Sequence, residues 1–186
     1  MFLLEVENEV ALKFPDHRDA GELFKAVDTD RRYLREWLPW VDSMKNEEDY
    51  VPVIEMWLKQ YAANDGFQAA ILHKGAIAGM AGFLSIDWNN RKTAIGYWLS
   101  EDRQGKGIMT NVCRKLTDLA FVHYGLNRVE IQCGTDNLKS RAIPERLGYT
   151  KEGVVRDGEF LYDHFHDLAQ YSMTRKDWEQ HNKEGS

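Results

Sequence analysis

Hydrophobic and polar residues recur with two different periods along this chain, and each change of period marks a predicted element. Thr93–Leu99 is rich in β-branched and aromatic residues and places alternate side chains on opposite faces, which predicts a strand. From Ile108 to Ala120 the apolar residues return at helical spacing on one stripe and predict an amphipathic helix. Gln104–Gly107 reads Gln-Gly-Lys-Gly, so a glycine-bearing turn is expected between this strand and this helix.

The same two periods predict the remaining elements. Strands are expected at Glu9–Phe14, Phe67–His73, Ala76–Ile86, Arg128–Gly134, Tyr149–Val155 and His166–Thr174, the second and third of these joined by a hairpin at Lys74-Gly75. Helices are expected from about His17 to Val27, from Arg31 to Trp37, from a cap at Ser43 or Asn46 to Tyr61, and from Ser140 to Leu147. The order β-α-α-α-β-β-β-α-β-α-β-β predicts an α/β (α+β) fold, a mixed sheet with helices on both faces. The tail from about residue 176 is polar and helical at best.

Composition indicates a folded soluble domain. The 186 residues are 43% hydrophobic and carry a net charge of −6, and the length predicts a single domain over residues 1–186. The lack of a basic run argues against nucleic acid as a direct partner. Cys113 and Cys133 are too few for a disulfide framework. No signal peptide or membrane-spanning apolar run is visible, so we expect no membrane partner and a cytoplasmic protein.

Residues 104–110 form a candidate cradle for a pyrophosphate. The first N–H groups of a helix lack intrahelical partners and carry partial positive charge, and glycines let a phosphate approach the backbone closely. Lys106 adds a mobile positive charge. A dinucleotide fingerprint would need a glycine where Thr110 stands, and a P-loop would need one where Ser100 stands. On the glycines alone, an ordinary strand-to-helix turn is the simpler interpretation.

Two motifs give the chain a resemblance to the GNAT N-acetyltransferases. Gln104–Met109 resembles the family's acyl-CoA-binding motif Q/R-x-x-G-x-G/A, although Met109 departs from the small last residue. Downstream, Asp136–Ala142 followed by Leu147–Tyr149 resembles the segment D-N-x-x-S-x-x…L-G-F/Y. In this order, with a predicted strand between them, the two motifs are far more specific than either alone. Over nearly the whole chain the resemblance is closest to the ribosomal-protein N-terminal acetyltransferase branch, the RimL/RimJ type.

The resemblance implies a fold and a cosubstrate. The implied GNAT-type acyl-CoA N-acyltransferase fold has a mixed central sheet of about seven strands, in which a splayed strand pair holds CoA. Acetyl-CoA is the implied cosubstrate, and no metal is expected. The implied cofactor-binding residues are Trp98, Leu99, Gln104, Gly105, Lys106, Gly107, Ile108, Met109, Thr110, Asn137 and Ser140. A homodimer or a higher homo-oligomer is also implied.

The resemblance also implies which residues transfer protons. Acyl transfer to an amine needs a base for the amine, stabilisation of the oxyanion and an acid for the thiolate. Glu159, in the expected connection between the last two strands, is the implied base; the alternative is a solvated turn carboxylate, with Asp157 and Asp163 as further candidates for the base. Ser140 is the implied acid near the thioester sulfur, and it would also suit a helix N-cap. The main-chain N–H of Leu99 is the implied oxyanion donor.

Aromatic residues and histidines mark the expected acceptor side. Trp37 and Trp40 flank a proline at an irregular stop, where aromatics line clefts or pack into the core. In the resembling branch this region covers the acceptor, so both are candidate acceptor-binding residues. His164 and His166 would share one strand face. Without a third ligand, they are expected to be packing or acceptor-side polar residues rather than a metal pair.

Three functions remain open from the sequence. The leading one is acetylation of a protein N-terminal α-amine, with a ribosomal protein as acceptor, by direct transfer in a ternary complex. An α-amine, with a reference pKa near 8, suits a general base better than lysine at about 10.4. A small amine such as a polyamine or aminoglycoside would predict an acidic acceptor cleft, and a peptide an open groove beside Trp37 and Trp40. The third is a CoA-binding regulatory protein without turnover, which the candidates for both proton transfers disfavour.

Overall fold

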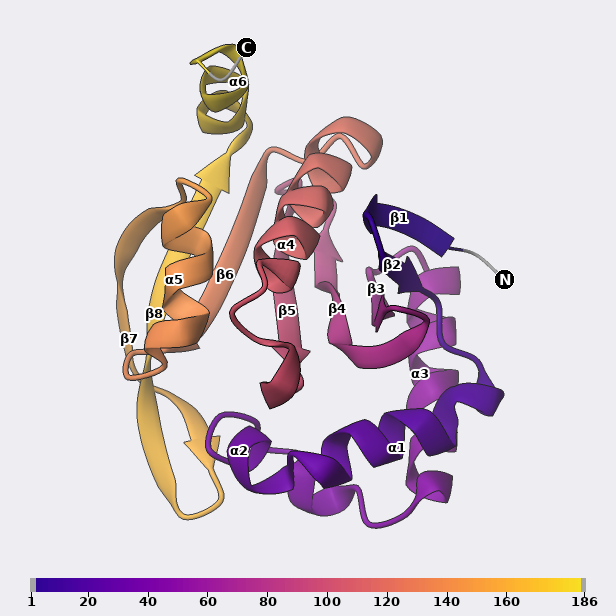
Figure 1. Cartoon of the computed structure of the whole chain (residues 1–186). Coiled ribbons are helices and arrows are strands. Elements are labelled where there is room, and N and C mark those ends of the chain that lie inside the picture. The colour runs from indigo at the N-terminus through magenta and orange to yellow at the C-terminus, as the bar shows by residue number, and fades with distance from the viewer. Residues whose placement is uncertain (1–2, 185–186) are drawn as a thin grey trace.

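The computed structural model describes residues 3–184, which form one mixed sheet of eight strands in the order β1-β2-β3-β4-β5-β6-β8-β7, with helices packed against it (Figure 1). The strands are β1 (Leu3–Glu7), β2 (Val10–Lys13), β3 (Phe67–His73), β4 (Ala76–Asp87), β5 (Lys92–Leu99), β6 (Arg128–Gly134), β7 (Thr150–Leu161) and β8 (His164–Thr174). The α-helices are α1 (Ala20–Thr29), α2 (Arg31–Arg35), α3 (Tyr50–Ala62), α4 (Ile108–Asp118), α5 (Leu138–Arg146) and α6 (Arg175–Glu184). The predicted mixed sheet and the predicted order of its central elements are confirmed.

The structure adds an element at each end of the predicted order. The sequence pattern predicts about seven strands, and the additional strand is β1, which forms an antiparallel hairpin with β2. Glu9 turns this hairpin with a φ of +66°, a role more often given to glycine or asparagine. At the other end the polar tail folds as α6. Its Trp178 indole N–H donates a 2.7 Å hydrogen bond to the Asp118 carboxylate of α4.

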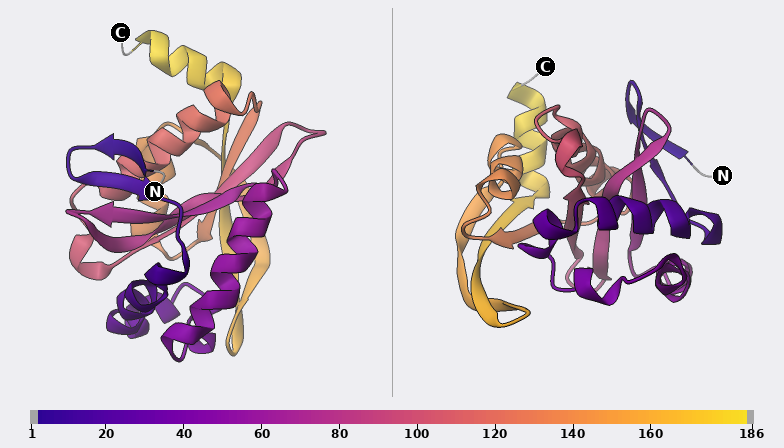
Figure 2. Two further views of the ribbon diagram at one scale, coloured as in Figure 1. Left: turned by 90° about the vertical axis from the view of Figure 1, so that its right-hand side faces the viewer. Right: turned by 60° about the horizontal axis from the view of Figure 1, so that its bottom comes forward.

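The sheet buries side chains on both faces and separates two hydrophobic clusters. α4 packs on one face, where Leu116 is fully buried. α1 and α3 cover the other face, where Leu23 is fully buried. Figure 2 shows α3 and α4 on opposite sides of the strands. β5 contributes to both clusters as its alternation predicts, with Leu99 in the first and Trp98 in the second.

β5 and β6 separate soon after they meet. They are the only parallel neighbours among the described strands, and their pairing runs from Lys92–Arg128 to Ala94–Glu130. β5 stays paired with β4 up to Leu99, and β6 stays paired with β8 up to Gly134. The two strands therefore diverge toward their carboxyl ends (Figure 1), and the splayed pair implied by the resemblance is present as a wedge that opens beside the start of α4.

The β7–β8 hairpin corrects one sequence expectation. Glu159 was expected in the connection between these strands, but it lies within β7, and the connection is Tyr162–Asp163. A β-bulge interrupts the pairing between Val155 and Glu159. Asp157, in the bulge, has a φ of +49° and donates its N–H to the Asp167 carboxylate at 2.8 Å. The sequence Asp-Gly resembles a hairpin turn, whereas here it marks a bulge that redirects the following side chain.

Candidate active site

A cavity of about 1920 Å³ opens in the wedge between β5 and β6. Its walls come from α2 and the segment after it, α3, α4, α5 and β7. The predicted site residues that line it are Trp37, Trp40, Trp98, Leu99, Gln104, Gly105, Gly107, Ile108, Met109, Thr110, Asn137, Ser140 and Glu159. Lys106 differs from these, because its ammonium donates to the Asp102 carbonyl at 2.9 Å instead of reaching into the cavity.

The cavity meets the N-terminus of α4. Gly107 precedes the helix with a φ of +77° and makes no side-chain cap, and Gly105 has a φ of +72°. A Cβ at Gly105 would have no atom within 4 Å, and one at Gly107 would approach only Asn111, at 3.9 Å. The backbone conformation requires glycine, while the space in front of the helix stays open. The uncapped N–H groups of the first turn can therefore receive an anion.

Cationic side chains surround this mouth of the cavity. Arg103, Arg114, Lys139 and Arg146 all line it. Sequence reasoning did not identify them as a cluster, because they come from the turn before α4, from α4 and from α5, which only the fold brings together. The Gln104 amide links two of the walls, donating to the Tyr33 hydroxyl at 2.6 Å and accepting from Lys139 at 2.9 Å. The positive charge suits a polyphosphate ligand.

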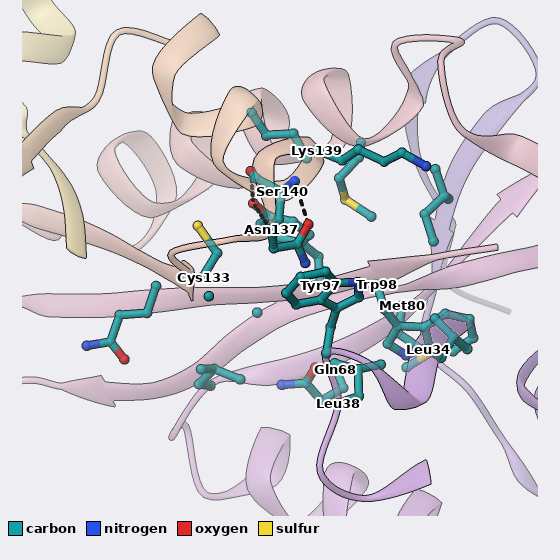
Figure 3. Close-up of a pocket in the computed structure, with 18 of the residues that line it drawn as sticks. Leu34, Leu38, Gln68, Met80, Tyr97, Trp98, Cys133, Asn137, Lys139 and Ser140 are labelled. Carbon is teal, nitrogen blue, oxygen red and sulfur yellow. Dashed lines mark hydrogen bonds between the residues drawn. The ribbon is translucent and has the colours of Figure 1, made fainter. Parts of the chain in front are cut away.

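Ser140 lies deeper in the wedge and is paired with Tyr97. Its hydroxyl donates to the Tyr97 hydroxyl at 3.2 Å, which donates to the Ser140 carbonyl at 3.0 Å (Figure 3). Burial raises the pKa of Tyr97 well above its ordinary value, so the phenol keeps its proton. The N-cap of α5 is Asn137, whose side chain accepts from the Ser140 N–H at 3.1 Å. Ser140 is therefore not the helix cap, and its hydroxyl is not committed to capping.

The backbone of β5 turns one of its edges toward the wedge. In antiparallel pairs, residues opposite each other alternate between bonded and non-bonded positions. Ser100 N–H donates to the Ala78 carbonyl at 2.8 Å, so the next pair, Gly79 and Leu99, is non-bonded. The N–H of Leu99 consequently points away from β4, to the side where β6 has already diverged.

Glu159 meets the cavity from β7 and pairs with a histidine of β8. Its carboxylate lies 2.8 Å from Nε2 of His166, the residue directly opposite it in the strand register. The alternative candidate Asp157 sits in the bulge with its main chain bonded to Asp167. Asp163 is exposed and pairs with His164 at 2.7 Å, and that hydrogen bond lowers the pKa of the Asp163 carboxyl. Of the three carboxylates, only Glu159 lines the cavity.

His164 and His166 therefore pair with different carboxylates. Within residues 3–184, no cluster of three or more His, Cys, Asp or Glu side chains could hold a metal ion. Cys133 lines the cavity beside Ser140 (Figure 3), and burial raises the pKa of its thiol to about 11. Cys113 is fully buried in the core. Neither thiol is an activated nucleophile.

The far end of the cavity is aromatic and apolar. The Trp40 and Trp98 rings lie 6.3 Å apart between centroids, and the further apolar lining residues include Leu34, Leu38, Met44, Val53, Met56, Trp57, Met80 and Leu84. The β7–β8 hairpin closes over this end, since the Tyr162 hydroxyl donates to the Leu38 carbonyl at 2.6 Å. The buried Tyr50 hydroxyl, also in the lining, has no hydrogen-bond partner among the described residues.

The arrangement brings an anion site, a hydroxyl pair and a carboxylate to one continuous cavity. A family model described as the acetyltransferase (GNAT) domain matches residues 10–150. The chain belongs to the GNAT acetyltransferase family. This confirms the resemblance found in the sequence, the fold it implied and the assignment as a transferase.

Individual GNAT proteins match over most of their length. The protein of Bacillus subtilis (strain 168) named "Putative ribosomal N-acetyltransferase YdaF" is 37% identical over 96% of this chain and 98% of its own. The ribosomal-protein-serine acetyltransferase of Escherichia coli (strain K12) is 27% identical over 91% and 94%. The solved structure of the microcin C7 self-immunity acetyltransferase MccE, in complex with acetyl-CoA and AMP, has a TM-score of 0.87 at 31% identity and covers 92% of this chain and 95% of that chain.

No helix within the described part of this GNAT chain is long and apolar enough to cross a membrane. The expected oligomer and the cytoplasmic location stay predictions.

Proposed function

We propose that this GNAT acetyltransferase moves the acetyl group of acetyl-CoA to the N-terminal α-amine of a protein, directly within a ternary complex, and that its acceptors are ribosomal proteins. The observation that carries the proposal is the continuity of one cavity from the N-terminus of α4, through the wedge, to Glu159 and the aromatic end. The names of the relatives from Bacillus subtilis and Escherichia coli support the ribosomal acceptor.

The residues of the cavity fit the chemistry of acetyl-CoA. The first turn of α4 behind Gly105 and Gly107 would receive the pyrophosphate, with Arg103 and Arg114 supplying positive charge. The free edge of β5 and the Asn137 side chain would bind the pantetheine arm as an added strand. When bound, acetyl-CoA supplies the thioester that is attacked. MccE, a relative at 31% identity, was solved with acetyl-CoA bound.

Residues of this chain would then carry out the proton transfers and stabilise the oxyanion. Glu159 takes a proton from the acceptor amine, because it is the carboxylate that faces the cavity from β7. The Leu99 N–H stabilises the oxyanion from the free edge of β5. Ser140, whose hydroxyl already donates to Tyr97, gives a proton to the departing thiolate. No covalent intermediate with the protein is needed, and both cysteines are buried.

The lining of the acceptor end favours a peptide over a small polycation. A polyamine or aminoglycoside would require an acidic cleft. The carboxylates that line the cavity are Asp65, Glu101 and Glu159, against a wall of aromatic and aliphatic side chains. An apolar groove beside Trp37 and Trp40 suits a peptide, whose main chain and first side chains make hydrogen bonds and apolar contacts.

Thiol release from acetyl-CoA tests the proposal against a panel of N-terminal peptides, polyamines and aminoglycosides. We expect turnover with peptides, a loss of roughly a hundredfold or more in kcat for Glu159→Gln, and acetyl-CoA binding unchanged in that variant. Blocking the peptide α-amine should abolish turnover, which controls for lysine acetylation. Turnover with small amines alone would contradict the peptide acceptor, and a wild-type rate for Glu159→Gln would remove it as the base.

A further inference from the structure

Among the described residues, the Glu159 carboxylate has one hydrogen-bonding partner, His166 of the neighbouring strand β8. Nε2 of His166 lies 2.8 Å from Oε2 of Glu159, and the two residues face each other across the β7–β8 ladder. A base must be an ionised carboxylate, which only accepts hydrogen bonds, so in the proposed mechanism Nε2 of His166 is the donor. Glu159 lines the cavity, whereas His166 is not among the described residues that line it. Because β8 lies between β6 and β7 and the two residues are directly opposite each other, the imidazole lies beside the carboxylate on the same face of the hairpin, between Glu159 and β6.

The imidazole is itself fixed in place. Its side chain is 16% exposed, against 34% for Glu159. A Cβ built on Gly134 of β6 would lie 3.0 Å from Cε1 and 3.1 Å from Nδ1 of His166, and 3.5 Å from the Trp37 ring. The ring thus lies directly against the β6 backbone, beside an aromatic residue of the acceptor end. A residue with a Cβ at position 134 would force the ring to shift by a few tenths of an ångström.

The bulge in β7 completes the arrangement. Between Val155 and Glu159 the register shifts, and the Asp167 carboxylate holds the bulge by accepting from the Asp157 N–H at 2.8 Å. A bulge re-aims the side chain that follows it. After the bulge, Glu159 lies directly opposite His166, where its side chain lines the cavity.

We propose that His166 is a positioning residue for Glu159: its Nε2–H occupies Oε2 and thereby presents Oε1 to the acceptor amine. This inference rests on the proposed role of Glu159 as the base. A carboxylate attached to a flexible side chain loses rate when its reactive oxygen is misplaced by about 1 Å. The hydrogen bond from a fixed ring removes that freedom, while His166 itself touches no reacting atom.

A merely structural pair is the competing explanation, and the same strand offers a matched control. His164 and Asp163 form a second His–carboxylate pair at 2.7 Å, with both side chains more than half exposed. Such an exposed pair contributes little to stability and lies outside the cavity lining. Substituting His164 therefore reproduces the loss of a histidine–carboxylate contact without disturbing Glu159.

The test compares His166→Gln, whose amide can still donate, with His166→Leu, which fills similar space against Gly134 but cannot donate. Steady-state rates are measured with an N-terminal peptide and acetyl-CoA, and folding is checked by thermal melting. We expect His166→Leu to lower kcat by roughly tenfold to a hundredfold with peptide KM within about twofold, His166→Gln to recover much of the rate, and His164→Leu to match the wild type.

A double-mutant cycle separates positioning from structure. In a Glu159→Gln background, His166→Leu should cause no further loss of kcat, because the group it orients is gone. Equal losses in both backgrounds, or a wild-type kcat for His166→Leu beside a slow Glu159→Gln enzyme, would overturn the role of His166 while leaving Glu159 as the base. A wild-type kcat for Glu159→Gln would instead overturn the base assignment itself.

Discussion

At the scale of single residues, the hydroxyl pair of Ser140 and Tyr97 offers two protons where the proposed mechanism needs one. Ser140 donates to Tyr97, and Tyr97 donates to the Ser140 carbonyl. Burial raises the pKa of Tyr97, so the phenol stays protonated at neutral pH and can reprotonate or orient the serine. The thiolate of CoA is a good leaving group, but a nearby donor still accelerates its departure.

Substitution of each partner separates the donor from its support. We expect Ser140→Ala to lower kcat by roughly a hundredfold, and Tyr97→Phe by about tenfold, because it removes the two hydrogen bonds that hold Ser140 but not the serine hydroxyl itself. Both variants should keep the acetyl-CoA Kd within a few fold, measured by calorimetry. A larger loss of kcat for Tyr97→Phe than for Ser140→Ala would make the phenol the proton donor.

At the scale of elements, the turn before α4 needs a residue that tolerates a left-handed backbone and that leaves the space in front of the helix open. Gly107 adopts a left-handed conformation as the N-cap, and the helix begins directly behind it with no side chain in front. Any residue with a Cβ would be strained there by roughly 1–2 kcal/mol. A charged one would also change the potential at the helix N-terminus.

Gly107→Glu tests this turn. A carboxylate about 4 Å from a phosphate costs several kcal/mol at the dielectric of a protein surface, so we expect acetyl-CoA affinity to fall by roughly a hundredfold or more. Gly75→Glu is the matched control, since Gly75 has a φ of +81° and nothing within 4 Å of its Cβ, in the β3–β4 turn. Calorimetry that found equal affinities for the two variants would place the phosphate site elsewhere.

The elements that the sequence predicted are those with a local signal. The alternation in β5 and the apolar stripe of α4 are each contained within one segment. In the structure, most of the apolar residues of both patterns are buried in the core. The sequence predictions were wrong where one local pattern is compatible with two different structures. Asp157-Gly158 has the composition of a hairpin turn but forms a bulge, so Glu159 was placed in the wrong element. Contacts such as Ser140 with Tyr97, 43 residues apart, have no local signal and required the folded chain.

At the scale of the whole molecule, three strands at the far side of the sheet are tied by one charge cluster. Arg128 of β6 donates to both carboxylate oxygens of Glu152 on β7. The Ser172 hydroxyl of β8, which lies between those strands, also donates to Glu152. Hydrogen bonds from Arg128 and Ser172 lower the pKa of the Glu152 carboxyl from its ordinary value of 4.5 to about 2.

This cluster makes the free energy of unfolding depend on pH in the acidic range. A carboxyl whose pKa is lowered by folding stabilises the native state above its ordinary pKa, and that contribution is lost as pH falls from 4.5 toward about 2. Because 38% of the Glu152 side chain is exposed, solvent screening limits the contribution to about 1 kcal/mol or less. Urea denaturation should show Glu152→Gln less stable than wild type at pH 7, with the difference shrinking below pH 4. A constant difference across pH would contradict the assignment.

The early divergence of β5 and β6 has a consequence for how long the protein survives. Beyond Ala94 and Glu130 the two strands are too far apart to form hydrogen bonds with each other. A ligand that binds between them would pair with their free main-chain groups. A compound that binds only the native state at roughly a hundred times its Kd adds about 2.7 kcal/mol to the free energy of unfolding. If acetyl-CoA fills the wedge as proposed, the protein with acetyl-CoA bound would unfold less often than the free protein.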